Sequence, residues 1–183
     1  MARSNNKEFF YIEKELLWKI FIYVLNQLVI KYKIQIHAFV LIDNHYHLIL
    51  TVTAKYNLSF IMQELQKSVS RRVNSKTGRI NHVFGGPYKA SLIQTPEYYF
   101  NVYKYLYRNP IEAGLCRNIN HYKFSSINTD AIPLTSPLTG IASYIPNQNV
   151  IEWLNKSENE KWLNSISKGL KKTVFKPVID RSY

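Results

Sequence analysis

Hydrophobic residues in the first third of the chain follow first a helical period and then a strand period. Apolar residues recur every three or four positions in residues 11–32, which predicts a helix with one apolar face. Residues 34–42 and 45–53 are rich in β-branched and aromatic residues, which predicts two strands. Asp43 and Asn44 between them tolerate turn geometry, so the two strands are predicted to form an antiparallel hairpin.

The middle of the chain predicts two more helices and a short strand. Residues 58–73 return to the helical period, and residues 88–94 are suited to a strand. Residues 95–97, Thr-Pro-Glu, mark a helix start, because Thr can cap, Pro fits the first helical turn and Glu favours the positive end of the helix dipole. This helix is predicted to run to about Asn109, where Pro110 interrupts or kinks it.

The C-terminal third predicts a linker and one last helix. Residues 127–149 contain three prolines and many Ser, Thr and Asn residues, which is typical of an extended loop. Ser157 and Glu160 form a capping-box pattern that opens a helix over residues 158–172. The lysines at the end of this helix suit the negative end of its dipole.

The order of these elements predicts an α+β fold, in which an antiparallel sheet is covered by helices. The predicted division is one domain over residues 1–126, followed by a linker and a basic helical tail over residues 127–183. No apolar run approaches the roughly 20 residues that span a bilayer, and the N-terminus lacks the apolar core of a signal peptide. We therefore expect no membrane partner and a cytoplasmic location.

The charge balance predicts a polyanionic partner. The chain has 24 Lys and Arg residues against 12 Asp and Glu residues, a net charge of +12. Nucleic acid is the first candidate for the partner, and an anionic membrane is the second. The 14 tyrosines suit single-stranded nucleic acid, whose bases stack on exposed rings, although most tyrosines in a protein are core or half-buried. The single cysteine, Cys116, excludes an internal disulfide and argues against a cysteine-based zinc site.

Two histidines in the second predicted strand are candidate metal ligands. Successive side chains of a strand point to opposite faces, so His45 and His47 share one face, while Tyr46, Leu48 and Leu50 share the other. The second face is apolar and should lie under the helices. Two imidazoles two residues apart on a strand can bind one metal ion, but an isolated pair is also compatible with surface or hydrogen-bonded histidines.

The tyrosine-rich helix offers a nucleophile and a further ligand. Tyr105 and Asn109 are four residues apart and project from one face of this helix. A tyrosine hydroxyl can attack a phosphodiester, and an amide oxygen can bind a cation that polarises the phosphate. Periodicity alone does not distinguish Tyr105 from the other tyrosines of the helix, which are Tyr98, Tyr99, Tyr103 and Tyr107.

These motifs together resemble the HUH single-tyrosine transposases, and most closely the REP-associated tyrosine transposases of bacteria. Four short patterns carry the resemblance, in the order and spacing of that family over residues 3–126. They are Asn44-His45-Tyr46-His47, Tyr105 with Asn109-Pro110, Ala113-Gly114-Leu115, and Tyr122 with Phe124-Ser125-Ser126.

The resemblance implies a ferredoxin-like domain that cuts and rejoins single-stranded DNA beside hairpins. Tyr105 is then the nucleophile that forms a 5′-phosphotyrosine link. His45 and His47 hold Mg²⁺ or Mn²⁺, with Asn109 at the position of the third ligand, and imidazoles suit Mn²⁺ better. Related enzymes complete this site within one chain or across a homodimer, so both arrangements remain open.

The resemblance also directs attention to basic residues and to a missing strand. Lys67, Arg71, Arg72 and Lys89 are candidates for phosphate contacts, although each alone also suits a solvated surface charge. The family begins with a strand before an Arg-Gly-Asn loop. Residues 2–10 resemble that loop and almost nothing precedes them, so we expect the first strand to be missing unless another segment fills its place.

Two other functions remain compatible with the sequence. A non-catalytic DNA- or RNA-binding protein derived from such a domain would use the same basic surface. A zinc hydrolase would use His45 and His47, and its activity would survive the loss of Tyr105.

Overall fold

The computed structural model describes residues 1–135 and 149–177, which belong to two compact units. Residues 1–88 and 123–135 form the first unit, and residues 89–122 pack with the described part of the C-terminal segment in the second. None of the helices in these ranges is long and apolar enough to cross a membrane. The predicted domain boundary at residue 126 is not tested by this division into units, and it stays a prediction.

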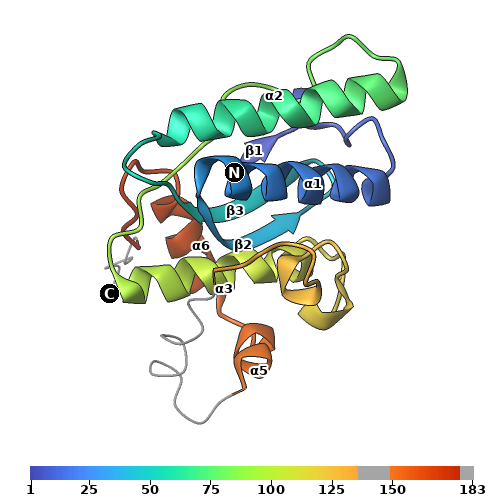
Figure 1. The fold of residues 1–183 in the computed structure, drawn as a ribbon. Coiled ribbons are helices and arrows are strands. Elements are labelled where there is room, and N and C mark those ends of the chain that lie inside the picture. Colours follow the sequence, from blue (N-terminus) through green and yellow to red (C-terminus); the bar gives the residue numbers. More distant parts are fainter. Residues whose placement is uncertain (136–148, 178–183) are drawn as a thin grey trace. The chain divides into compact units, whose positions relative to one another are not determined.

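The first unit is a small antiparallel sheet covered by two helices (Figure 1). Along the chain it contains β1 (Ala2–Arg3), α1 (Lys14–Tyr32), β2 (Gln35–Leu41), β3 (His45–Thr51) and α2 (Leu58–Thr77). The strand order is β1-β3-β2, and α1 and α2 lie side by side on one face of the sheet. This is the βαββα order of a ferredoxin-like fold. The predicted α+β class is therefore confirmed.

The predicted hairpin is confirmed with a two-residue turn. The backbone N–H of Ile42 donates to the carbonyl of His45 at 2.8 Å, which leaves Asp43 and Asn44 between the strands. Val40 pairs with His47, and the register shifts by one residue near His37. The pairing of Val40 with His47 sets the register of the hairpin near its turn. This register determines which residues of β3 point to each face of the sheet.

The first strand is almost absent, as the sequence predicts, because β1 has only two residues. In a ferredoxin-like sheet a fourth strand lies beside the first. Residues 83–85 occupy the place of this fourth strand. The N–H of Asn5 donates to the carbonyl of Val83, and the N–H of Gly85 donates to the carbonyl of Arg3. A Cβ at Gly85 would lie 2.8 Å from the Ser4 carbonyl oxygen, so this close approach needs glycine.

Aromatic side chains hold α1 against the sheet. The rings of Trp18 and Phe39 stack with centroids 5.4 Å apart, and Phe21 contacts Phe39 and Tyr46 at 5.2 and 5.0 Å. Phe21, Phe39 and Tyr46 are fully buried, and rings of this size dominate the hydrophobic energy of a small core. Because Tyr46 is fixed under α1, its neighbours His45 and His47 must point to the other face of β3.

Residues 123–135 cover the outer edge of β2. The N–H of Leu41 donates to the Phe124 carbonyl at 3.0 Å, and the N–H of Phe39 donates to Ser126 Oγ at 2.8 Å, at the short 3₁₀ helix η3 (Ser126–Asn128). These bonds protect a strand edge that would otherwise be open to pairing with other chains. Of the predicted linker over 127–149, residues 136–148, with Pro137 and Pro146, lie outside the described residues.

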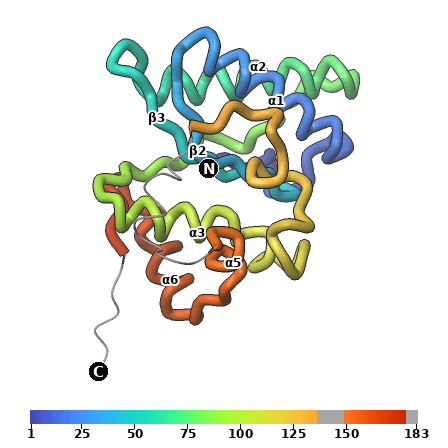
Figure 2. The backbone as a smooth tube through the Cα atoms, turned by 60° about the horizontal axis from the view of Figure 1, so that its bottom comes forward, coloured from blue at the N-terminus to red at the C-terminus, as the bar shows by residue number. Residues whose placement is uncertain are grey.

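The described part of the second unit contains α3 (Pro96–Glu112) with two shorter helices, α5 (Val150–Asn155) and α6 (Glu160–Gly169), beside it (Figure 2). The described residues contain two further 3₁₀ turns, η1 (Asn5–Lys7) in the first unit and η2 (Ile119–His121) in the second.

Three sequence predictions for the second unit need correction. Helix α3 continues three residues past Asn109, because Pro110 removes one helical N–H while its ring is accommodated in a buried position. Residues 88–94 form no strand, only one bridge between Leu92 and Val174. The last helix is capped by Asn159, whose Oδ1 accepts from the Trp162 N–H, and it is shorter than predicted at both ends.

Two buried cations on α3 hold the C-terminal helices. Lys104 is 2% exposed, forms an ion pair with Glu158 and lies over the Trp153 ring. Arg108 is 4% exposed and donates to three backbone carbonyls at the end of α5, at 2.9–3.2 Å, as well as to Glu112. The last carbonyls of a helix have no hydrogen-bond partner within it. Arg108 supplies donors to these carbonyls, which would otherwise be buried without a partner.

We expect Glu158→Ala to lower the free energy of unfolding by about 1–3 kcal/mol, because it leaves the buried Lys104 ammonium without its counter-ion. Lys104→Met should be less destabilising, since it fills a similar volume and buries no charge. Urea denaturation of both variants checks this. A Glu158→Ala protein as stable as wild type would contradict the prediction.

Candidate functional site

His45 and His47 form a pair on one face of β3. Their ring centroids are 5.0 Å apart and the rings meet edge to face. Arg3 of β1 pairs with His45, and Val40 of β2 pairs with His47, so the histidines occupy the middle strand of the sheet. Both side chains are neither fully buried nor fully exposed. The predicted division of β3 into a histidine face and a Tyr46 face is therefore what the structure has.

Asn44 orients the ring of His45. The Asn44 Nδ2 group donates to the Lys7 carbonyl at 2.7 Å, and Asn44 Oδ1 lies 2.7 Å from His45 Nδ1. Because a backbone carbonyl only accepts, the amide nitrogen of Asn44 must face Lys7 and its oxygen must face His45. That oxygen also only accepts, so Nδ1 of His45 carries the proton. The Nε2 lone pair of His45 is thereby left for a ligand.

Both histidines are kept neutral by their surroundings. Burial lowers the pKa of His45 to about 4, and the positive charges of Arg3 and the chain's N-terminus act in the same direction, against a smaller opposite effect of Asp43. The pKa of His47 also lies well below its ordinary value, first because of burial and then because of the neighbouring His45. Neutral imidazoles are the form that binds metal ions.

The imidazole nitrogens of His45 and His47 suit a divalent cation that takes two of its ligands from β3. Among the described residues there is no cluster of three or more His, Cys, Asp and Glu side chains that could hold a metal. An amide or water oxygen would complete the coordination of such an ion. His45 with its tautomer fixed by Asn44 is the arrangement that protein metal sites use to orient a ligating imidazole.

Tyr105 and Asn109 lie on α3, in the second unit. Both are partly exposed, and they project from one face of the helix as predicted. The Asn109 Nδ2 group donates to the Tyr105 carbonyl at 2.6 Å. This bond occupies the nitrogen of the amide, and the Asn109 oxygen is the atom suited to a cation. The buried cations Lys104 and Arg108 flank these two residues on the same helix.

The predicted DNA-contacting cations differ in their surroundings. Lys67 and Arg71 on α2 are exposed, as is Lys89 in the second unit. Arg72 is partly covered, because its guanidinium lies 4.0 Å from the centre of the Tyr23 ring on α1. All four stay predictions as phosphate contacts.

Sequence reasoning missed two residues beside the histidines. The sequence predicts a turn at Asn44, and its side chain also joins Lys7 to His45. Arg3 was placed in a loop, whereas it pairs directly with His45 and so lies on the histidine face of the sheet. The motif Asn-His-x-His contained a signal for Asn44. Nothing local in the sequence could reveal Arg3, because its position depends on pairing between β1 and β3.

The chain matches the family model described as "Transposase IS200 like" over residues 2–109, which is more than half of its 183 residues. It belongs to the IS200-like transposase family. The match spans both histidines and reaches Asn109. The resemblance seen in the sequence motifs is thus confirmed at the level of the family. A search of curated proteins found no match.

The fold of this chain is also that of a solved structure. It is similar to the structure described as a REP-associated tyrosine transposase bound to a REP hairpin, with a TM-score of 0.56 and 13% sequence identity. The alignment covers 86% of this chain and 82% of the other. At this identity the likeness concerns the fold, and the hairpin DNA belongs to the relative.

We expect Asn44→Ala to weaken Mn²⁺ binding by about 10- to 100-fold, because the His45 ring loses the acceptor that fixes its tautomer. Asn120→Ala, the same change at an exposed residue of the second unit, is the matched control. Isothermal titration with Mn²⁺ measures both. Equal affinity of Asn44→Ala and wild type would show that Asn44 does not orient a ligand.

The low pKa of His45 predicts an acid-sensitive fold in metal-free protein. Between about pH 6.5 and pH 4 the unfolded chain binds a proton at His45 and the folded chain does not, so the free energy of unfolding falls as pH falls through this window. His45→Gln should lose less stability over the same range. Urea midpoints from pH 7 to pH 4 test this, and identical pH dependence of the two proteins would refute it.

Proposed function

We propose that this transposase cuts and rejoins single-stranded DNA at hairpin-flanked sites through a 5′-phosphotyrosine intermediate. The neutral histidine pair on β3, with His45 oriented by Asn44, supports the proposal most strongly. Membership of the IS200-like transposase family supports a role for this histidine pair in the processing of DNA. The proposal requires that Tyr105 and the histidines meet at one phosphate, within a chain or between two chains.

In this mechanism the Tyr105 oxygen attacks the phosphorus of a DNA phosphodiester. The bond between phosphorus and the 3′ oxygen breaks, and the DNA keeps a free 3′-hydroxyl while its 5′ phosphate becomes linked to Tyr105. The phenol proton goes to solvent, and the leaving 3′ oxygen takes up a proton. The phosphotyrosine ester conserves the energy of the original bond, so attack by a 3′-hydroxyl rejoins the strand without ATP.

The other residues of the site bind and orient. His45 and His47, with Asn109 as a third ligand, would hold Mg²⁺ or Mn²⁺, and such an ion supplies charge that polarises the phosphate. The two neutral imidazoles favour Mn²⁺. Arg3, exposed beside His45, is suited to hold an adjacent phosphate of the backbone. Lys67, Arg71, Arg72 and Lys89 are proposed to contact the backbone further away.

We expect wild-type protein with Mn²⁺ to form a covalent adduct with a hairpin DNA carrying single-stranded flanks. Tyr105→Phe should still bind this DNA, but its adduct formation should fall at least about a thousandfold, because the nucleophile is gone. Tyr98→Phe, two turns earlier on the same helix, is the control and should react normally. Denaturing gels with labelled DNA measure the adduct.

The other outcomes identify the alternative functions. If wild type binds hairpin DNA but forms no adduct with any such substrate, the chain is a nucleic-acid-binding protein that has lost catalysis. Cleavage that persists in Tyr105→Phe and requires zinc would instead indicate a hydrolase built on His45 and His47.

A further inference from the structure

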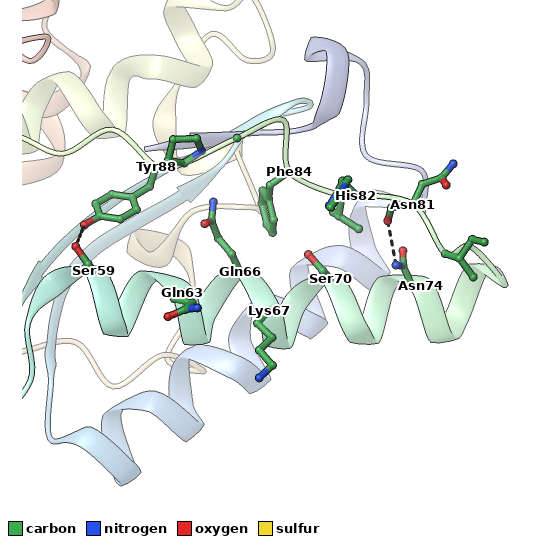
Figure 3. A pocket seen from close by; sticks show the side chains of 14 residues that line it. Ser59, Gln63, Gln66, Lys67, Ser70, Asn74, Asn81, His82, Phe84 and Tyr88 are labelled. Atoms are coloured by element: carbon green, nitrogen blue, oxygen red, sulfur yellow. Dashed lines mark hydrogen bonds between the residues drawn. The ribbon is translucent and has the colours of Figure 1, made fainter.

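A groove of about 640 Å³ lies between α2 and residues 80–88 of the first unit (Figure 3). It is separate from the histidine pair. Phe84, which lines the groove, contacts the ring of Tyr46 at 6.0 Å, and Tyr46 points to the face of β3 opposite the histidines. The volume lies within the range of about 300–1,000 Å³ that is usual for ligand sites.

One wall of the groove is a polar stripe on α2. Its members recur every three or four residues and so lie on one face of the helix, and they are Ser59, Gln63, Gln66, Ser70 and Asn74. Among the described residues, no aspartate or glutamate lines the groove, and the lining lysine, Lys67, adds a positive charge. A wall of uncharged amides and hydroxyls beside a lysine suits a ligand that has polar edges and a negative backbone.

Two buried polar atoms of this wall have no hydrogen-bond partner among the residues that the structure describes. They are Nε2 of Gln66, a donor, and Oδ1 of Asn74, an acceptor. The nitrogen of Asn74 is already used, since it donates to the Asn81 carbonyl at 3.0 Å. A buried polar atom without a partner is costly, and rotation of these two amides toward the groove would let a ligand with both donors and acceptors remove that cost.

The opposite wall supplies aromatic rings. Phe84 is held by edge-to-face contacts with Phe10 at 5.9 Å and with Tyr46. Tyr88 is fixed by a hydrogen bond between its hydroxyl and Ser59 Oγ at 3.0 Å. In Figure 3 the side chain of Gln66 extends from α2 into the space between these two rings. Fixed rings beside a side-chain amide form the combination that binds an unpaired nucleobase, by stacking and by hydrogen bonds to its edge.

We propose that this groove binds unpaired bases of the single-stranded DNA substrate, with Gln66 reading an adenine. A glutamine amide matches adenine because it donates to one ring nitrogen and accepts from the exocyclic amine. The inference rests on the proposed single-stranded DNA substrate. It adds a base-reading site on α2 that lies apart from the residues proposed for cleavage.

The test measures DNA affinity in the Tyr105→Phe background, where no covalent product forms. The probes are short single-stranded oligonucleotides of dA, dC, dG or dT. We expect the dA probe to bind most tightly. Gln66→Leu should weaken dA binding by about 5- to 100-fold and remove the preference among bases. Gln27→Leu, the same change at an exposed position of α1, is the matched control and should leave both unchanged.

The salt dependence separates reading of bases from general loss of charge or structure. Lys67→Gln should lower the slope of log affinity against log salt by about one, whereas Gln66→Leu should leave the slope unchanged. A DNA probe carrying iodouracil within a dA tract should cross-link, on irradiation, to the tryptic peptide of residues 80–89. This second measurement needs no substitution at Gln66.

Equal binding of all four probes by the Tyr105→Phe protein, or an unchanged dA preference when Gln66→Leu is added to it, would overturn the inference. Cross-links confined to other peptides would do the same. These outcomes are independent of the adduct assay. If wild type forms the adduct and Gln66→Leu has no effect on base preference, the groove proposal is rejected and the cleavage proposal stands. If wild type forms no adduct and Gln66→Leu removes the dA preference, the cleavage proposal is rejected and the groove proposal stands.

Discussion

The hydrogen bonds of the Asn44 amide are the interaction on which the candidate site depends. One end of this side chain holds the Lys7 carbonyl, and the other end accepts the Nδ1 proton of His45. The backbone of Asn44 adds a further tie, because its carbonyl accepts the Ser4 N–H at 2.8 Å. The N-terminal segment, the hairpin turn and the His45 ring are therefore fixed by one residue. With the ring so oriented, the Nε2 lone pair of His45 is available for a cation.

The aromatic core supplies the second constraint, since it determines which face the histidines take. Tyr46 is buried against Phe21 and Phe39, and the alternation of a strand then directs His45 and His47 away from α1. A one-residue slip of β3 would exchange the two faces and place imidazoles in the core. The same ring of Tyr46 contacts Phe84, so the core that orients the histidines also forms one wall of the α2 groove. Packing, the histidine face and the groove are thus linked through one side chain.

Much of this arrangement could be predicted from the sequence because it depends on local patterns. The hairpin, α1, α2 and the start of α3 follow from hydrophobic periods and caps, and the pair His45 and His47 follows from strand alternation. The prediction that α3 ends at about Asn109 is wrong, because Pro110 within the helix costs only one hydrogen bond. The motif signals Asn44, but neither its contact with Lys7 nor the position of Arg3 could be predicted, since both join segments about forty residues apart. The roles of Tyr105 and Asn109 came from the family pattern, because five tyrosines share that helix.

The most direct test of the account is whether Tyr105 approaches a cation held by His45 and His47. A fluorinated tyrosine placed at position 105 reports this by fluorine NMR, because Mn²⁺ broadens the signal of a nearby fluorine. The account predicts strong broadening on addition of Mn²⁺, in the full chain with hairpin DNA, and its loss in a His45→Ala and His47→Ala double variant. A signal that stays sharp with saturating Mn²⁺ would contradict the proposal that these residues form one DNA-cutting site.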